Sequence, residues 1–191
     1  EKVIFEKLLG NGENFGIEIN YEIQIKPEGI AQAFLIGEEF IGDANAALIL
    51  GDNLFHGNNL FKILEQANSN KKGATIFVYE VKDPNRYGVV EFNSEGKVLK
   101  IEEKPKKTKS NFAVTGLYFY DNSVIKKAKS INFSDRGELE ITSINEIYMK
   151  NCWFRFSSAH IFCSILYTCC VPPVYIVYIV CVGYIMLIHF P

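Results

Sequence analysis

The stretch "LILGDNLFHG", residues 48–57, joins an apolar run to a glycine, an acid and an amide. With the two alanines before it the run reads "AALILG", and a continuous apolar run is typical of a strand covered on both faces of its sheet. Asp52 follows this strand directly. Because ligands of open α/β sheets bind beyond the carboxyl ends of the strands, the stretch predicts a buried strand and a ligand site at Asp52.

Strand and helix patterns alternate on both sides of this stretch. We expect further strands over residues 17–23, 74–81 and 112–120, two short strands joined at 94–96, and helices over 2–9, 30–42, 58–68, 123–128 and 142–150. The last helix is expected to begin with a capping box formed by Ser143 and Glu146. The alternation predicts an α/β protein with a mainly parallel, mixed sheet and helices on both of its faces.

Composition limits the class of protein. The 191 residues suffice for a domain with a core, and the net charge of −2 gives no reason to expect a nucleic-acid partner. All five cysteines follow residue 151, so the part before it holds no disulfide, which suits a cytoplasmic protein. The start carries no signal-peptide pattern, does not begin with Met and already looks helical, so we expect a chain cut at its N-terminus.

Asp52 and the segment "EEKP", residues 102–105, are candidates for binding phosphates. A carboxylate at a strand end suits Mg²⁺, which takes one or two protein carboxylates and fills its shell with phosphates and water. The alternative is that the Asp52 carboxylate accepts hydrogen bonds from nearby backbone amides of its own turn. The acids of "EEKP" could bind sugar hydroxyls and Lys104 a phosphate, or the segment could be a solvated hairpin end. His56 has no second His or Cys nearby, so zinc is not expected.

Two other segments could approach a ligand with their backbone. "QIKPEGIAQA" places Gln24 and Gly29 before a helix, where an amide could read a base edge, or where a helix simply starts. "DPNRYG" ends in Gly88, which would admit a ligand close to the backbone, or which only serves a turn.

The order of the motifs is more specific than any one of them. The chain carries, in sequence, "LLGNGENFGIEINY", "KPEGIAQAF", "LILGDNLFHG", "DPNRYGVVEF", "EEKPKKTKSNFAVTGLYFYD" and "RGELEITSINEIY". Over about residues 2–150 it closely resembles the glucose-1-phosphate thymidylyltransferase family of sugar nucleotidyltransferases. The resemblance implies a Rossmann-like nucleotide-diphospho-sugar transferase fold, Mg²⁺, a homotetramer, and the joining of dTTP and glucose 1-phosphate into dTDP-glucose with release of pyrophosphate, as in rhamnose synthesis.

The resemblance also implies roles for individual residues. Nucleotide binding falls to Gln24 at the thymine edge, and to Pro27, Gly29, Ile30 and Asp52. Binding of the sugar phosphate falls to Tyr87, Gly88, Glu103, Lys104, Val114 and Tyr118. Asp52 is expected to hold the Mg²⁺, and Asp52 and Lys104 are the expected catalytic residues.

Two departures from the family lead to further expectations. The resemblance implies a glycine-rich triphosphate loop before residue 1 and a second metal-binding Asp after the last matched helix, so the domain over residues 1–150 is expected to be partial and nearly inactive alone. The alternative is a non-catalytic nucleotide-sugar-binding module, membrane-tethered or not. Uridylyl specificity stays open, whereas Gly51-Asp52-Asn53 lacks the Asp-x-Asp typical of glycosyltransferases.

Residues 151–191 form a hydrophobic tail that resembles nothing in the family. Residues 174–190 carry no full charge and reach the lower limit, about 17 residues, for a membrane span. The other interpretation is a frameshift or a gene-model error, which the irregular composition and the lack of a basic flank favour. The cysteine spacing does not fit a four-thiol metal site.

Overall fold

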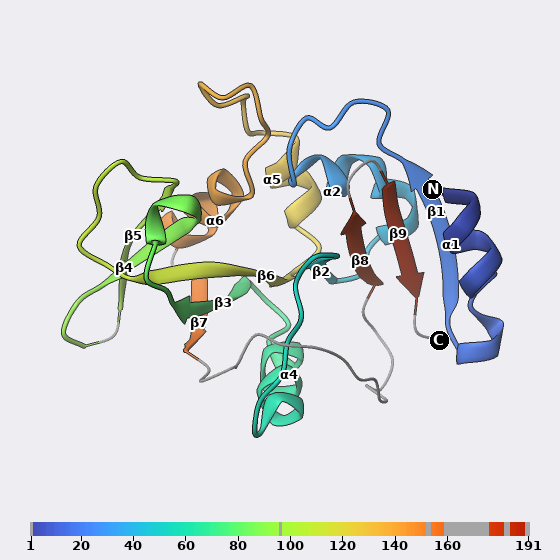
Figure 1. The fold of residues 1–191 in the computed structure, drawn as a ribbon, viewed down its shortest axis with the longest axis horizontal. Coiled ribbons are helices and arrows are strands. Elements are labelled where there is room, and N and C mark those ends of the chain that lie inside the picture. The colour runs from blue at the N-terminus through green and yellow to red at the C-terminus, as the bar shows by residue number, and fades with distance from the viewer. Residues whose placement is uncertain (1, 96, 152–153, 159–175, 182–183, 190–191) are drawn as a thin grey trace.

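The computed structural model describes residues 2–95, 97–151, 154–158, 176–181 and 184–189, and these contain a single mixed sheet flanked by helices (Figure 1). The strands are β1 (Glu18–Ile23), β2 (Ala46–Leu50), β3 (Ala74–Glu80), β4 (Gly88–Phe92), β5 (Val98–Glu103), β6 (Phe112–Tyr120), β7 (Phe154–Ser158), β8 (Ile176–Cys181) and β9 (Tyr184–His189). The helices are α1 (Lys2–Leu9), α2 (Gln32–Ile36), α3 (Glu38–Ile41), α4 (Leu60–Ser69), α5 (Val124–Ala128) and α6 (Ile141–Lys150), with 3-10 turns η1 (Glu13–Phe15) and η2 (Pro84–Arg86).

The strand order is β1-β9-β8-β2-β6-β3-β7, and β4 pairs with both β5 and β6. The α/β class and the mixed sheet are confirmed, but the expectation of mainly parallel neighbours is wrong. Strand β6 lies between β2 and β3 and is antiparallel to both, while β8 is parallel to β2 and β7 to β3. Parallel neighbours need a long crossover, usually a helix, and the described residues between β3 and β6 form no α-helix. The chain therefore returns through the β4–β5 hairpin as an antiparallel strand.

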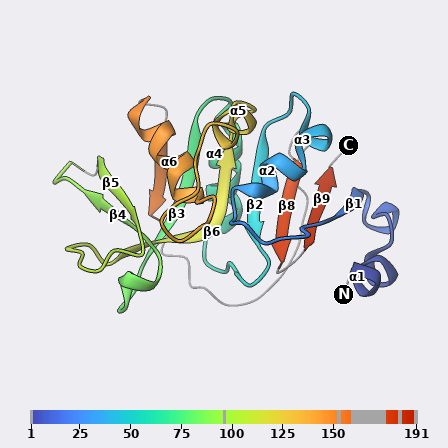
Figure 2. The same ribbon diagram turned by 90° about the horizontal axis from the view of Figure 1, so that it is seen from above.

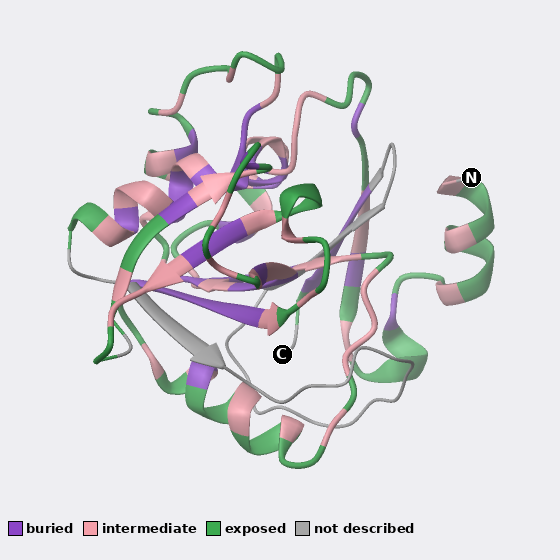
Figure 3. Cartoon of the chain, turned by 60° about the vertical axis from the view of Figure 1, so that its left-hand side comes forward, coloured by how far each residue is buried: buried purple, intermediate pink, exposed green. Residues whose placement is uncertain are grey.

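Helices cover both faces of the sheet, as expected (Figure 2). The alternation of side chains along β3 divides the core, because Ile76 and Val78 pack in the main cluster with α2, α5 and α6. Phe77 points to the other face and packs with Ala67 of α4. Helix α1 lies outside these layers, beside β1, and none of its residues is buried (Figure 3).

The last two strands, β8 and β9, form a hairpin within the sheet. Strand β9 pairs along its whole length with β1, and β8 pairs with β2. No helix among the described residues is long and apolar enough to cross a membrane. Residues 159–175, with three of the five cysteines, lie outside the described residues, so the interpretations of the tail and its division at residue 150 stay predictions.

Asp121, directly after β6, ties three elements together. Its Oδ2 accepts a hydrogen bond from the Gly73 amide (2.6 Å), and its Oδ1 accepts from the Ser123 amide (3.1 Å) and the Tyr148 hydroxyl (2.7 Å). Burial acts to raise the pKa of the Asp121 carboxyl, but the hydrogen bonds from Ser123, Gly73 and Tyr148 outweigh it, so this pKa lies below its ordinary value. The network thereby fixes the starts of β3 and α5 and the end of α6.

Replacing Tyr148 by Phe removes one donor to this carboxylate. We expect Tyr148→Phe to lower the free energy of unfolding by about 1 kcal/mol at neutral pH. This figure allows for solvent screening, because the Asp121 carboxylate is only partly buried. A carboxyl with a lowered pKa stabilises the fold at pH values above its ordinary pKa, and this contribution is lost as the pH falls through the folded-state pKa. The difference from wild type should therefore shrink in acid. Urea unfolding at neutral and acidic pH measures it, with Tyr120→Phe as control.

The control removes a bond to a neutral group, since the Tyr120 hydroxyl donates to Asn145 Oδ1 (2.7 Å). Its loss of stability should not depend on pH in the range where Asp titrates. A loss that depends on pH equally in both variants would contradict the role given to Asp121.

Candidate functional site

Asp52 lies in an exposed turn at the carboxyl end of β2, as predicted. Its neighbour Asn53 holds the turn. The backbone N–H of Asn53 donates to Leu50 O (3.0 Å), and its side-chain Nδ2 donates to Asp52 Oδ1 (2.7 Å). Asn53 Oδ1 in turn accepts from the amide of Gly116 on β6 (3.0 Å). A Cβ atom at Gly116 would lie 2.7 Å from Asn53 Cγ, so the glycine is what lets β6 approach this closely. Asn53 and Gly116 were not predicted as site residues.

Three of the predicted sugar-phosphate residues converge on one point. Gly88 and Glu103 face each other across the β4–β5 ladder, and a Cβ atom built at Gly88 would lie 3.3 Å from Glu103 Oε2 and 3.6 Å from Val114 Cγ2. Two residues that the sequence did not indicate complete the group. Thr142 Oγ1 donates to Glu103 Oε2 (2.5 Å), and the Arg136 guanidinium lies 3.5 Å from Glu103 Oε1. Glu103 is therefore held from two sides.

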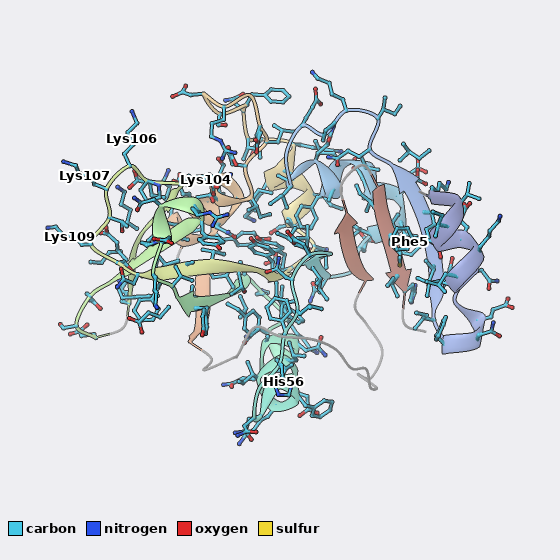
Figure 4. The ribbon with its side chains drawn as sticks, in the orientation of Figure 1. Phe5, His56, Lys104, Lys106, Lys107 and Lys109 are labelled. Carbon is cyan, nitrogen blue, oxygen red and sulfur yellow. The ribbon has the colours of Figure 1, made fainter. Side chains whose placement is uncertain are left out.

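Lys104 follows β5 and is exposed. Its amide donates to Tyr87 O (3.0 Å), which brings these two predicted residues together. Its φ of 42° is left-handed, which is uncommon for a residue with a side chain. Figure 4 shows Lys106, Lys107 and Lys109 pointing outward from the following loop, whereas Lys104 lies nearer the centre of the molecule. Lys104 is thus set apart from the lysines of this loop.

Tyr118, the last predicted sugar-phosphate residue, is buried on β6 and stacks on Tyr120, with ring centroids 6.1 Å apart. Burial, with a smaller contribution from the charge of Glu103, raises the pKa of its hydroxyl above the ordinary range. The side chain therefore stays neutral and packs in the main core beside Tyr120.

Apart from Asp52, the predicted nucleotide residues lie in the loop between β1 and α2, which we call the 24–31 loop. Gln24 is only 7% exposed, although it follows the exposed end of β1. Two backbone bonds tie this loop to the segment before α6: the Leu139 amide donates to Glu28 O (2.6 Å), and the Ala31 amide donates to Leu139 O (3.1 Å). We call this pair of bonds the Leu139 bridge.

The Leu139 bridge joins the two halves of the predicted site. The segment that carries Leu139 also carries Arg136, whose guanidinium bonds Glu138 (2.9 Å) and Glu140 (3.3 Å) besides its contact with Glu103. Burial raises the pKa of the Glu140 carboxyl. Residues that are far apart in the sequence, in the 24–31 loop and around Glu103, are therefore connected through one short segment.

Asp52 is the residue that the sequence predicted to hold a divalent cation. The described part of the chain contains no group of three or more His, Cys, Asp or Glu placed to hold a metal ion. Asp52 offers one exposed carboxylate, and Mg²⁺ commonly takes one or two protein carboxylates beside phosphate and water oxygens. His56 is exposed beside α4 (Figure 4). A separate cavity of about 300 Å³ at Asp121, Lys127 and Tyr148 includes none of the predicted site residues.

Thr142→Val tests whether Thr142 holds Glu103. The substitution keeps the shape and removes the hydroxyl. If Glu103 binds the sugar phosphate that the resemblance implies, the affinity for glucose 1-phosphate should fall roughly tenfold, given that a hydrogen bond to a charged group is worth about 1.5–3 kcal/mol. Thr142→Ser keeps the hydroxyl and should retain most of the affinity. Calorimetry compares the two variants, and equal affinities would contradict the role.

Comparisons with known proteins show which family the chain resembles. A family model described as "Nucleotidyl transferase" matches residues 1–154. The chain is 53% identical over 147 residues to a glucose-1-phosphate thymidylyltransferase of Neisseria meningitidis, covering 77% of this chain and 51% of that protein. It is 50% identical over 149 residues to one of Xanthomonas campestris, covering 78% and 50%.

Solved structures give the same result. A Bacillus anthracis protein assigned as a glucose-1-phosphate thymidylyltransferase, in complex with sucrose, matches with a TM-score of 0.74 and 39% identity, covering 84% of this chain and 64% of that one. A UDP-glucose pyrophosphorylase with UDP-glucose shares the fold, with a TM-score of 0.63 and 23% identity. The chain spans about half the length of the curated relatives it matches. On the extent of these matches, the chain belongs to the nucleotidyl transferase family.

Proposed function

We propose that the protein is a glucose-1-phosphate thymidylyltransferase, which joins dTTP and glucose 1-phosphate into dTDP-glucose and releases pyrophosphate. The observation that carries the proposal is the convergence of Gly88, Glu103 and Val114 at one end of the sheet, linked by the Leu139 bridge to Gln24. A sugar nucleotidyltransferase needs such a pair of connected subsites, one for a base and one for a sugar. The relatives at about half identity carry this name.

The reaction needs positioning and charge neutralisation more than covalent help from the protein. An oxygen of the sugar's phosphate forms a bond to the α-phosphorus of dTTP, while the bond to the β-phosphate oxygen breaks and pyrophosphate leaves with that electron pair. In our proposal Glu103, held by Thr142, accepts hydrogen bonds from glucose hydroxyls, and Lys104 holds the sugar's phosphate. Tyr87, Gly88, Val114 and Tyr118 line the sugar.

The nucleotide is proposed to lie on the other side of the Leu139 bridge. Gln24 meets the edge of the thymine, and Pro27, Gly29 and Ile30 lie beside the base. Asp52 would hold a Mg²⁺ ion, which neutralises charge on the phosphates when it is bound. The family resemblance further supports a cytoplasmic homotetramer as the assembly of the whole enzyme.

The 191-residue chain can be tested directly for this function. We expect it to bind dTDP-glucose in calorimetry and to show little turnover in a pyrophosphate-release assay with dTTP, glucose 1-phosphate and Mg²⁺, because the chain spans about half the length of its relatives. Lys104→Ala should weaken binding, whereas Lys107→Ala, an exposed lysine of the same loop, should not. Binding of dTDP-glucose without Mg²⁺-dependent binding of dTTP would favour the non-catalytic nucleotide-sugar-binding alternative. Absence of binding would overturn the proposal, robust turnover would contradict the expectation that the chain is nearly inactive alone, and dUTP in place of dTTP tests uridylyl specificity.

A further inference from the structure

The amide of Gln24 is held in one orientation by a chain of hydrogen bonds in the 24–31 loop. A glutamine amide has an oxygen on one side and a nitrogen on the other, and it can turn over to exchange them. A free glutamine therefore offers a ligand either an acceptor or a donor at the same place. Which of the two a base meets depends on what holds the amide.

Gln32, at the start of α2, has only one orientation that satisfies its own neighbours. The backbone amide of Glu28 is always a donor, and it lies 3.2 Å from Gln32 Oε1. The carboxylate of Glu28 is always an acceptor when ionised, and its Oε2 lies 3.0 Å from Gln32 Nε2. Turning this amide over would place donor against donor and acceptor against acceptor. The two groups of Glu28 thus fix which side of Gln32 is the oxygen.

The orientation of Gln32 then fixes that of Gln24. Gln32 Oε1 accepts a hydrogen bond from Gln24 Nε2 (2.5 Å), and the second proton of Gln24 Nε2 is directed at Gly29 O, at a longer distance of 3.4 Å. The nitrogen of the buried Gln24 amide is thereby engaged, and the oxygen is left as an acceptor. The bond to Gly29 O is longer and therefore weaker, so this N–H of Gln24 can instead donate a hydrogen bond to a carbonyl oxygen of a ligand.

We infer that Glu28 and Gln32 are positioning residues that make Gln24 select a base with an N–H donor beside a carbonyl oxygen, as in thymine and uracil, against cytosine. The inference rests on the proposed function, in which Gln24 meets the base. Cytosine presents a bare ring nitrogen at the place of this N–H and an amino group at the place of the carbonyl. It would set acceptor against acceptor and donor against donor in a buried site, which is costly.

The test compares dTTP and dCTP as ligands of the 191-residue chain by calorimetry. Gln32→Leu removes the bond that fixes Gln24, so we expect the ratio of the two affinities to fall by about 10–100-fold, largely through better binding of dCTP. Gln66→Leu is the matched control, because it makes the same substitution at an exposed glutamine of α4, outside the 24–31 loop. It should keep most of the preference for dTTP.

A second measurement needs no ligand. In the NMR spectrum of the free protein, the Nε2 protons of Gln24 should exchange with solvent more slowly in the wild type than in Gln32→Leu. If the wild type prefers dTTP and Gln32→Leu keeps the same ratio of affinities, the inference is wrong and the proposed function stands. If neither nucleotide binds the wild type, the proposed function fails. If the Nε2 protons of Gln24 also exchange equally fast in the wild type and in Gln32→Leu, the inferred orientation of the Gln24 amide is wrong as well.

Discussion

Gly29→Ala is expected to lower the free energy of unfolding by about 3 kcal/mol, from the sum of overpacking and an unfavourable backbone conformation. Gly29 has a φ of 112°, which residues with a side chain rarely adopt. A Cβ atom there would lie 2.4 Å from Leu139 O and 2.6 Å from Leu139 N. Both are backbone atoms of the Leu139 bridge, so no side-chain movement can relieve the overlap. The bridge must open, and dTDP-glucose affinity should fall with it.

Gly16→Ala is the control that separates the two causes. Gly16 also has a positive φ, 68°, but a Cβ atom there meets nothing within 4 Å. Gly16→Ala should lower the free energy of unfolding only through the unfavourable backbone conformation, by about 1 kcal/mol. Urea unfolding of both variants measures the difference. Equal losses of stability would show that the close approach to Leu139 contributes nothing.

Asp52→Ala is expected to weaken the binding of dTTP in the presence of Mg²⁺ by about 100-fold, because the proposed metal ion would lose its protein carboxylate and no longer neutralise charge at the phosphates. The same substitution should change the free energy of unfolding by less than about 0.5 kcal/mol, since the side chain is exposed. The Mg²⁺ dependence of dTTP binding should disappear at the same time. Calorimetry with and without Mg²⁺ follows this dependence independently of turnover.

Asp43→Ala is the matched control, because Asp43 is also exposed but lies before β2, whereas Asp52 follows it. It should leave the affinity for dTTP and its Mg²⁺ dependence unchanged. If Asp52→Ala binds dTTP with the same Mg²⁺ dependence as the wild type, the role proposed for this carboxylate is wrong.

Local patterns predicted the elements and several site positions. The run "AALILG" forms β2, whose first three residues are buried, and Asp52 lies at its end as expected. The capping box predicted at Ser143 and Glu146 was wrong: α6 begins at Ile141 after Glu140, without a side-chain cap. The preceding segment is held by its own bonds to the 24–31 loop, so tertiary contacts set this helix start rather than a local cap.

The remaining features depend on contacts between distant segments. The direction of β6 follows from its connection through β4 and β5, which strand patterns do not reveal. Thr142 and Arg136 reach Glu103 across more than thirty positions of sequence, so neither carries a local signal. Only the motif "RGELEIT" pointed to this segment, and it did so by resemblance rather than by geometry.

The Leu139 bridge has a consequence for how this protein can change in evolution. Both of its bonds are made by main-chain atoms, and the Leu139 side chain is buried in the main core, so an apolar side chain of similar size can replace it without removing either bond. What must also be preserved is the length of the two segments, because an insertion or deletion in either would move the partners out of register. Proline at position 31 or at position 139 would remove a donor from the bridge itself.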